Sequence, residues 1–232
     1  MERYVFGNGV RVKKEDLLDV QLERYAAEGN PNLHEPVEEE WILRAFSQAA
    51  SAEPVFLDVG AGIGYYSILI KKTWADARIY AVEALPRHAQ AIVETLALNQ
   101  LPASAVTIIT DAVGDSDGWA EFIDYGYSSL LSSETGNADA IRVKTRTLTG
   151  LLADLPPVHL MKMDIQGGEL AVLNEARAIL GQGRVSHVMI GTHGADLHAS
   201  VRDLLVECGF KLLHDDPAPP MQPDGILLGA WG

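Results

Sequence analysis

Residues 55–67, VFLDVGAGIGYYS, constrain the fold of this chain more than any other stretch. Five mostly apolar, β-prone residues lead into three glycines at alternate positions, Gly60, Gly62 and Gly64, and an apolar run of helical length begins at Tyr65. This pattern predicts a buried strand, a tight loop and a helix. Glycine allows a positive φ and a close approach of backbone to ligand, and the helix N-terminus beyond it offers free N–H groups. We therefore expect a ligand-binding turn, and a glycine-rich turn without a ligand is the less favoured alternative.

The elements expected after this loop alternate between helix and strand. Further strands are expected at residues 78–83, 106–110, 159–164 and 185–190, helices at 86–97, 169–180 and 197–208, and a final antiparallel hairpin at 210–214 and 225–231. Such alternation predicts an α/β fold with a mostly parallel sheet and helices on both faces. Two additional β-like pieces, 119–124 and 141–145, flank a polar loop over residues 126–139.

The N-terminal segment reads differently from the rest of the chain. A hairpin is expected over residues 4–12, where Gly7-Asn8-Gly9 supplies the turn, and two helices are expected over 15–28 and 38–50. We therefore expect an N-terminal hairpin and helical cap over residues 1–50, followed by one domain over residues 51–232.

Charge and composition narrow the partners and the setting. The formal net charge is −14, from 18 basic and 32 acidic residues, so phosphate backbones and anionic lipids would be repelled. A single cysteine, Cys208, excludes an internal disulfide and is expected in the core. The chain begins without a secretory signal pattern and has no apolar run of membrane-spanning length. We expect a cytoplasmic protein with no nucleic-acid or membrane partner; the sequence does not reveal its oligomeric state.

Polar residues stand where the expected core strands end. Asp58, Glu83, Asp111 and Asp164 each close or follow a strand, and His193 follows the fifth. In an open parallel sheet, ligands bind beyond the C-terminal ends of the strands, near the switch in strand order. The site is therefore expected at this edge of the sheet.

A family resemblance follows from these same segments. The glycine loop, with an acid two residues before its first glycine, is similar to the S-adenosylmethionine (SAM) signature of class I methyltransferases. The succession FLDVGAGIGYYS, YAVEALP, ITDAVGDSDG and HLMKMDIQGGELAVL resembles the FkbM family of SAM-dependent methyltransferases. The last piece is the most specific, because that family reads close to L-K-I-D-x-E-G-x-E there. Lys162, Asp164, Gly167 and Glu169 keep the pattern, whereas Gln166 replaces the usual Glu.

The resemblance implies a class I, Rossmann-like fold with a seven-stranded sheet, and SAM as the cofactor. Glu83 offers two acceptor oxygens suited to the ribose hydroxyls. Asp111 would accept from the adenine amine, and Asp58 would hold the loop or accept from the methionine ammonium. Simple solvated or turn-forming acids are the alternatives for Glu83 and Asp111. The implied cofactor-binding residues are Asp58, Gly60, Ala61, Gly62, Gly64, Tyr65, Glu83, Ala84, Asp111, Ala112 and Asp164.

Two side chains are candidates for the chemistry itself. Asp164 stands at a strand end beside the expected methyl group, although it could equally cap the following helix. His193 is the second candidate, because a neutral imidazole could deprotonate a hydroxyl near neutral pH. With Asp196 and His198 it could instead form a metal cluster, but Mg²⁺ prefers oxygen ligands, and we expect no metal.

Three further residues are expected to contact the acceptor substrate: His34, Glu35 and Gln166. His34 and Glu35 lie in the loop between the two expected cap helices and could close over the acceptor, although Glu35 could simply cap the second helix. The family commonly has an acid where Gly191 stands, so the sequence departs from the pattern at that position as well as at Gln166.

These observations favour a SAM-dependent methyltransferase, most simply an O-methyltransferase acting on a hydroxyl of a small metabolite or natural-product intermediate. Carboxyl or N-methylation by the same fold is the first alternative. A non-catalytic SAM-binding module and a nicotinamide-dependent dehydrogenase are the others, although the G-x-G-x-x-G register of a dinucleotide site is absent.

Overall fold

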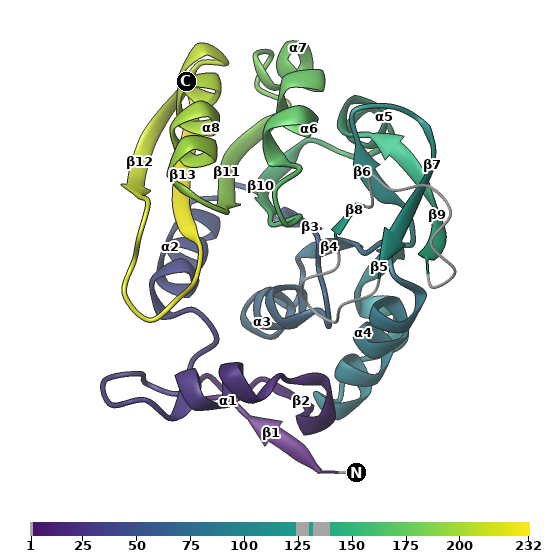
Figure 1. Cartoon of the computed structure of the whole chain (residues 1–232), viewed down its shortest axis with the longest axis vertical. Coiled ribbons are helices and arrows are strands. Elements are labelled where there is room, and N and C mark those ends of the chain that lie inside the picture. The colour runs from purple at the N-terminus through teal and green to yellow at the C-terminus, as the bar shows by residue number, and fades with distance from the viewer. Residues whose placement is uncertain (1, 124–129, 132–139) are drawn as a thin grey trace.

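A seven-stranded sheet forms the centre of the computed structural model, which describes residues 2–123, 130–131 and 140–232 (Figure 1). The strand order is β12-β13-β11-β10-β3-β4-β5, and only β13 runs against the others. The bounds are β3 Val55–Val59, β4 Arg78–Val82, β5 Thr107–Ile109, β10 Val158–Met163, β11 Val185–Thr192, β12 Phe210–Asp216 and β13 Gly225–Trp231. The mostly parallel sheet and its antiparallel closing hairpin are confirmed.

Helices cover both faces of this sheet, as expected. One hydrophobic cluster packs the sheet against α2 (Pro36–Phe46), α3 (Tyr65–Thr73) and α4 (Pro86–Leu98). A second cluster packs the other face against α5 (Leu148–Asp154), α6 (Glu169–Glu175), α7 (Arg177–Leu180) and α8 (Ala195–Glu207). Side chains of β3 alternate between the layers: Phe56 belongs to the first cluster and Leu57 to the second. None of the described helices combines the length and apolarity needed to cross a membrane.

The N-terminal segment packs below α3 and α4 (Figure 1). The expected hairpin is present as β1 (Arg3–Val5) and β2 (Arg11–Lys13), and its neighbour is helix α1 (Asp19–Ala26). Phe6 and Tyr25 belong to the same hydrophobic cluster as Phe56, so this segment shares the core of the sheet. α1 begins four residues later than expected because Leu18 is extended, and its N–H donates to the Gln21 Oε1.

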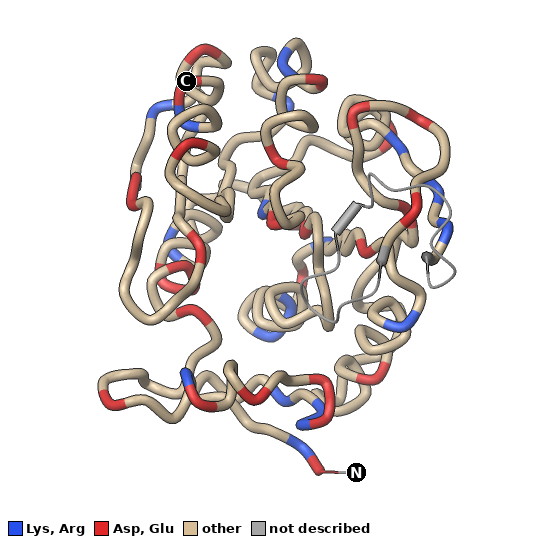
Figure 2. The backbone as a smooth tube through the Cα atoms, in the orientation of Figure 1, with Lys and Arg blue, Asp and Glu red and all other residues tan. Residues whose placement is uncertain are grey.

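Other differences concern details outside the central sheet. A second sheet, of order β6-β9-β7-β8, contains β6 (Ala112–Gly114), β7 (Gly118–Ile123), β8 (Leu130–Leu131) and β9 (Ala140–Thr147). Apart from β8, the polar loop expected over 126–139 lies outside the described residues. The helix expected over 169–180 is two helices, because Ala176 leaves helical dihedrals. In the described part of the chain, acidic and basic residues alternate without a long basic run (Figure 2).

Candidate active site

The glycine loop after β3 is fixed by contacts that exclude a side chain. Gly60 has φ +80°, and a Cβ at this position would lie 1.9 Å from the carbonyl oxygen of Asp164. Its N–H donates to Val82 O at 2.9 Å, which ties the loop to the end of β4. Gly64, also at φ +80°, begins α3, and a Cβ there would lie 3.0 Å from the Ile68 Cδ1. The loop therefore requires glycine for its conformation and for its packing.

A first cavity opens beside this loop, at the ends of β3, β4 and β5, and contains about 640 Å³ of empty space, part of it open to solvent. Six of the predicted cofactor residues line it together, and so does Asp164. The lining includes Gly60, Gly62, Glu83, Ala84, Asp111, Ala112, Asp164, His88 and Phe122. The structure thus brings together the residues expected around an adenosine group, and adds His88 and Phe122, which sequence reasoning missed.

Glu83 is held rigidly at the end of β4. Its Oε2 accepts from the N–H of Gly62 at 2.8 Å, and its Oε1 accepts from the N–H of Leu85 at 2.9 Å. Each carboxylate oxygen has a second lone pair, so both remain able to accept from a diol. The Asp111 carboxylate, mostly buried, lies 3.8 Å from Lys144 Nζ. The geometry fits the predicted ribose role of Glu83.

A second cavity, of about 500 Å³, lies on the other side of Gly60 and Gly62 and is also lined by Ala61, Asp58, Tyr65, Tyr66, Lys162, His34 and Asp164. Asp58 is buried, and its Oδ2 accepts from Ser67 Oγ at 2.7 Å. Within the described residues, its Oδ1 has no hydrogen-bond partner. Burial raises the pKa of Asp58, although the Lys162 ammonium opposes this. An unpartnered buried carboxylate oxygen fits the ammonium of a methionine moiety, so the donor set suits SAM.

Tyr65 is placed differently from its predicted role. Its ring lines the second cavity, but its hydroxyl donates to Glu39 Oε1 at 2.6 Å and accepts from Asn8 Nδ2 at 2.8 Å. The polar end of this side chain therefore ties α3 to the N-terminal segment. A contact with cofactor could come only from the ring.

A third cavity, of about 1160 Å³, opens between α1, the loop before α2, the end of β10 and the loop between β12 and β13. The three predicted substrate residues, His34, Glu35 and Gln166, all line it. Asp164 borders all three cavities, and His34 borders the second and third. The cavities therefore meet at Asp164, at the end of β10. Gln166, at φ +60°, donates from Nε2 to Asp164 Oδ1 at 3.1 Å.

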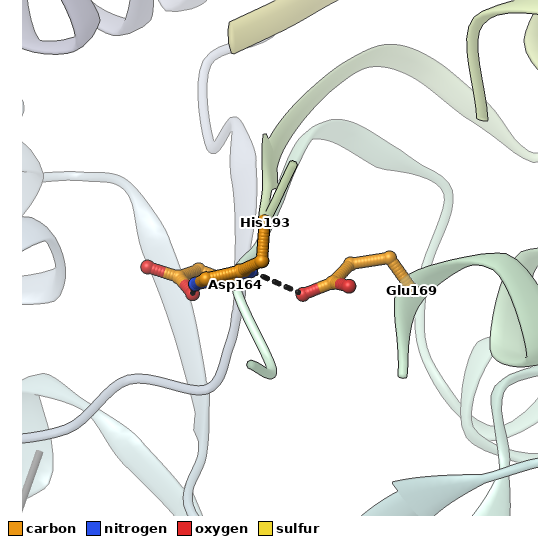
Figure 3. A group of neighbouring side chains, drawn as sticks. All are labelled: Asp164, Glu169 and His193. Atoms are coloured by element: carbon orange, nitrogen blue, oxygen red, sulfur yellow. Dashed lines mark ion pairs between the residues drawn. The ribbon is translucent and has the colours of Figure 1, made fainter. Parts of the chain in front are cut away.

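The predicted base His193 lies among carboxylates (Figure 3). Its Nδ1 is 3.5 Å from Glu169 Oε1, and its Nε2 is 3.7 Å from Asp164 Oδ1 and 3.2 Å from Asp224 Oδ1. Burial disfavours the charged imidazole, but these carboxylates more than offset it and raise the pKa of His193 to about 9. At neutral pH the ring is therefore a cation, so the prediction that neutral His193 accepts a proton loses its premise.

The metal alternative considered for His193 requires other partners than the sequence suggested. His198 lies away from it, sharing hydrogen bonds with Thr192 Oγ1 at 2.7 Å and Asp215 Oδ1 at 2.8 Å. Instead, Asp164, Glu169 and His193 each offer one ligand atom, all within 4.8 Å of one another. This set could hold a divalent cation, while ion pairing with the imidazolium accounts for the same contacts.

His34 is the imidazole at the junction between cavities. Its Nδ1 shares a 2.5 Å hydrogen bond with the Tyr25 hydroxyl, and its Nε2 is 3.9 Å from Glu35 Oε2. Burial lowers the pKa of His34, and the nearby Glu35 carboxylate only partly compensates. Unlike His193, His34 is therefore neutral at pH 7.

A buried lysine behind Asp164 was recognised in sequence only as part of a family motif. Lys162 Nζ lies 3.6 Å from Asp164 Oδ2, 3.4 Å from Glu38 Oε1 and 4.8 Å from the centre of the Tyr66 ring. Burial raises the pKa of Glu38 to about 8, although Lys162 opposes this. A lysine inside an otherwise apolar strand signals a buried anionic partner, but only the fold identifies Glu38.

Comparisons with known proteins agree with this geometry. The family described as "Methyltransferase FkbM domain" matches residues 58–212, more than half of the chain. A Jannaschia sp. (strain CCS1) protein, provisionally described as a methyltransferase, is 26% identical over 220 residues, covering 82% of this chain and 77% of its own. The methyltransferase sdnD of Sordaria araneosa is 24% identical over 199 residues, covering 71% and 76%.

Solved structures share the fold. A methyltransferase FkbM from Methylobacillus flagellatus KT has a TM-score of 0.57 at 17% identity; the alignment covers 77% of this chain but only 44% of that one. Magnesium protoporphyrin IX methyltransferase from Synechocystis PCC 6803, solved with bound SAM, has a TM-score of 0.53 at 12% identity, covering 92% and 90%.

Proposed function

Because this chain belongs to the FkbM methyltransferase family and is a SAM-dependent methyltransferase, we propose that it methylates a hydroxyl group of a small metabolite or natural-product intermediate. Bound SAM supplies both the methyl group and its leaving group, so the protein's part is to align the acceptor and to manage its proton. The methyltransferase relatives give no support to the dehydrogenase or to a non-catalytic module.

The charge of the third cavity carries this proposal. Glu35, Asp164 and Asp224 line it, against the single basic side chain Arg24 among its lining residues. A carboxylate acceptor would meet net like charge there, which disfavours carboxyl methylation. A hydroxyl is neutral, and as a hydrogen-bond donor it suits carboxylate oxygens.

An amine acceptor is the second candidate, because the same three carboxylates would attract an ammonium group. They would also stabilise its protonated form, in which nitrogen has no free lone pair for the methyl group. N-methylation would therefore need a proton acceptor working against the local field. This places it behind O-methylation.

His34 is the side chain we assign to the acceptor proton. It borders both the second and third cavities and is neutral at pH 7, as a general base must be. The role requires the tautomer in which Nδ1–H donates to the Tyr25 oxygen, leaving the lone pair of Nε2 free. In the same proposal, Gln166 and the His193 imidazolium position Asp164 at the junction of the cavities.

The acceptor atom can be identified from the product. SAM carrying a tritiated methyl group would be incubated with panels of alcohols, carboxylic acids and amines, and labelled products treated with mild alkali. We expect label that survives alkali and is not retained by a cation exchanger, as for a methyl ether. Alkali-labile label would indicate an ester, and retained label an amine; either would contradict O-methylation of a hydroxyl.

Two earlier expectations remain part of this proposal. The acidic composition supports a small-molecule acceptor rather than nucleic acid or membrane, and a cytoplasmic setting.

A further inference from the structure

The mouth of the third cavity is apolar, in contrast to its acidic interior. Leu18 is 40% exposed, Val20 66% and Met221 39%, and all three line the cavity together with Pro223. We call these four residues the apolar rim. Single exposed apolar side chains are ordinary on a protein surface, but several around the opening of one cavity indicate a binding surface.

The rim is a built feature of the fold. Val20 lies on the first turn of α1, and Leu18 is fixed just before it by the hydrogen bond from its N–H to Gln21. Met221 comes from the distant β12–β13 loop and adopts φ +64°, a conformation that costs energy for a residue with a side chain. Its Cε lies only 2.8 Å from where a Cβ of Gly29 would stand, so this loop packs against the segment after α1.

Polar groups occupy the opposite end of the cavity. Glu35, Asp224 and Gln166 line its walls, and Asp164 marks its junction with the other two cavities. The empty space of about 1160 Å³ exceeds what one hydroxyl-bearing ring would fill. A small, wholly polar acceptor would leave the rim in water and gain nothing from it.

We propose that the acceptor is amphipathic: a neutral hydroxyl-bearing head enters toward Asp164, and an attached apolar body lies on Leu18, Val20 and Met221. This inference rests on the proposed O-methylation only for the head group. The apolar body is argued from the rim alone.

Alkyl glycosides of increasing chain length test this without knowledge of the natural acceptor. Methyl, butyl and hexyl β-D-glucoside would be titrated calorimetrically into protein saturated with S-adenosylhomocysteine (SAH). Each added methylene that reaches the rim should tighten binding about two- to four-fold, as expected for partial to full burial of a CH₂ group. Equal affinities along the series, or no binding by any member, would overturn the proposal.

Matched variants locate the effect. Val20→Ser removes an apolar rim side chain from a helix, whereas Val206→Ser makes the same change on α8 at a residue 54% exposed and away from the cavity. The double variant Val20→Ser/Met221→Ser should flatten the chain-length series with SAH affinity unchanged, and Val206→Ser should leave the series intact. A full series in the double variant would place the alkyl chain elsewhere and overturn the proposal.

Two controls separate this inference from its premises. Butylamine and hexylamine carry the same chains on an ammonium head; if they show the chain-length gain and bind more tightly than the glucosides, the rim is supported while the hydroxyl assignment fails. Light scattering under the titration conditions tests whether the rim is instead a contact between two copies of the chain. A dimer that the double variant dissociates would overturn the proposal.

Discussion

The cofactor end and the acceptor end of the site are built from different kinds of structure. The first cavity is bordered by backbone of the glycine loop and by acids at successive strand ends, such as Glu83 and Asp111. The third is bordered by side chains from α1, the loop before α2, β10 and the β12–β13 loop. One end is set by the sheet itself, so it is shared by the fold; the other depends on how separate segments meet, so it can vary with the acceptor.

The largest effect is expected at the acceptor end. His34→Ala should lower kcat by about 10²–10⁴, the scale of a general base, with SAM affinity little changed. Because burial lowers the pKa of His34, wild-type kcat should stay level as the pH falls past 6.5, the ordinary histidine value, and drop only below it.

His193→Ala is the matched control for that prediction. Its imidazolium pairs with Asp164, Glu169 and Asp224, so its loss should lower kcat much less than the loss of His34. The reverse order, measured on the acceptor found with labelled SAM, would restore His193 as the base.

At the cofactor end, Gly60→Ala should destabilise the fold by about 3–5 kcal/mol, summing left-handed strain and the clash with Asp164 O. Gly9→Ala isolates the strain, because Gly9 has φ +81° and its nearest neighbour would be Lys72 Nζ at 3.7 Å. Urea unfolding and SAH titration measure both variants. Similar losses for the two would show that the 1.9 Å contact relaxes and does not constrain the loop.

Glu83→Ala should weaken SAM binding by about 2–3 kcal/mol, the cost of losing paired hydrogen bonds to a charged acceptor. The carboxylate also holds the N–H groups of Gly62 and Leu85, so part of this loss would come from a looser loop. Glu53→Ala, at an exposed acid away from the cavities, is the control. Unchanged affinity with intact circular dichroism would mean that the ribose is held by other residues.

What the sequence could reveal follows the same division. Glu83, Asp111 and Asp164 could be predicted together because the ends of neighbouring parallel strands meet at one edge. The charge of His193 could not, because it depends on carboxylates from α6, β10 and the β12–β13 loop. Nor could the late start of α1: apolar spacing reveals a helical face but not the residue that begins the helix.

The smallest effect concerns stability and pH. His193 has a pKa of about 9 in the folded chain and about 6.5 when unfolded, so its ion pairs stabilise fully below pH 6.5 and lose their effect as the pH rises through 9. Urea unfolding should therefore show His193→Asn less stable than wild type by about 1–2 kcal/mol at pH 6, with the gap closing by pH 10.

His187→Asn is the control for this pH dependence, because burial lowers the pKa of His187 and leaves it neutral across the upper part of that range. A gap for His193→Asn that stays constant from pH 6 to pH 10 would show that the imidazole contributes packing rather than charge.

A crystal structure with bound SAH tests the division between the two ends most directly. We expect the ribose on Glu83, the adenine beside Asp111 and Ala112, the methionine ammonium at Asp58, and the sulfur facing the third cavity near Asp164 and His34. SAH with its sulfur turned away from that cavity, or with its adenine among Leu18, Val20 and Met221, would contradict the account.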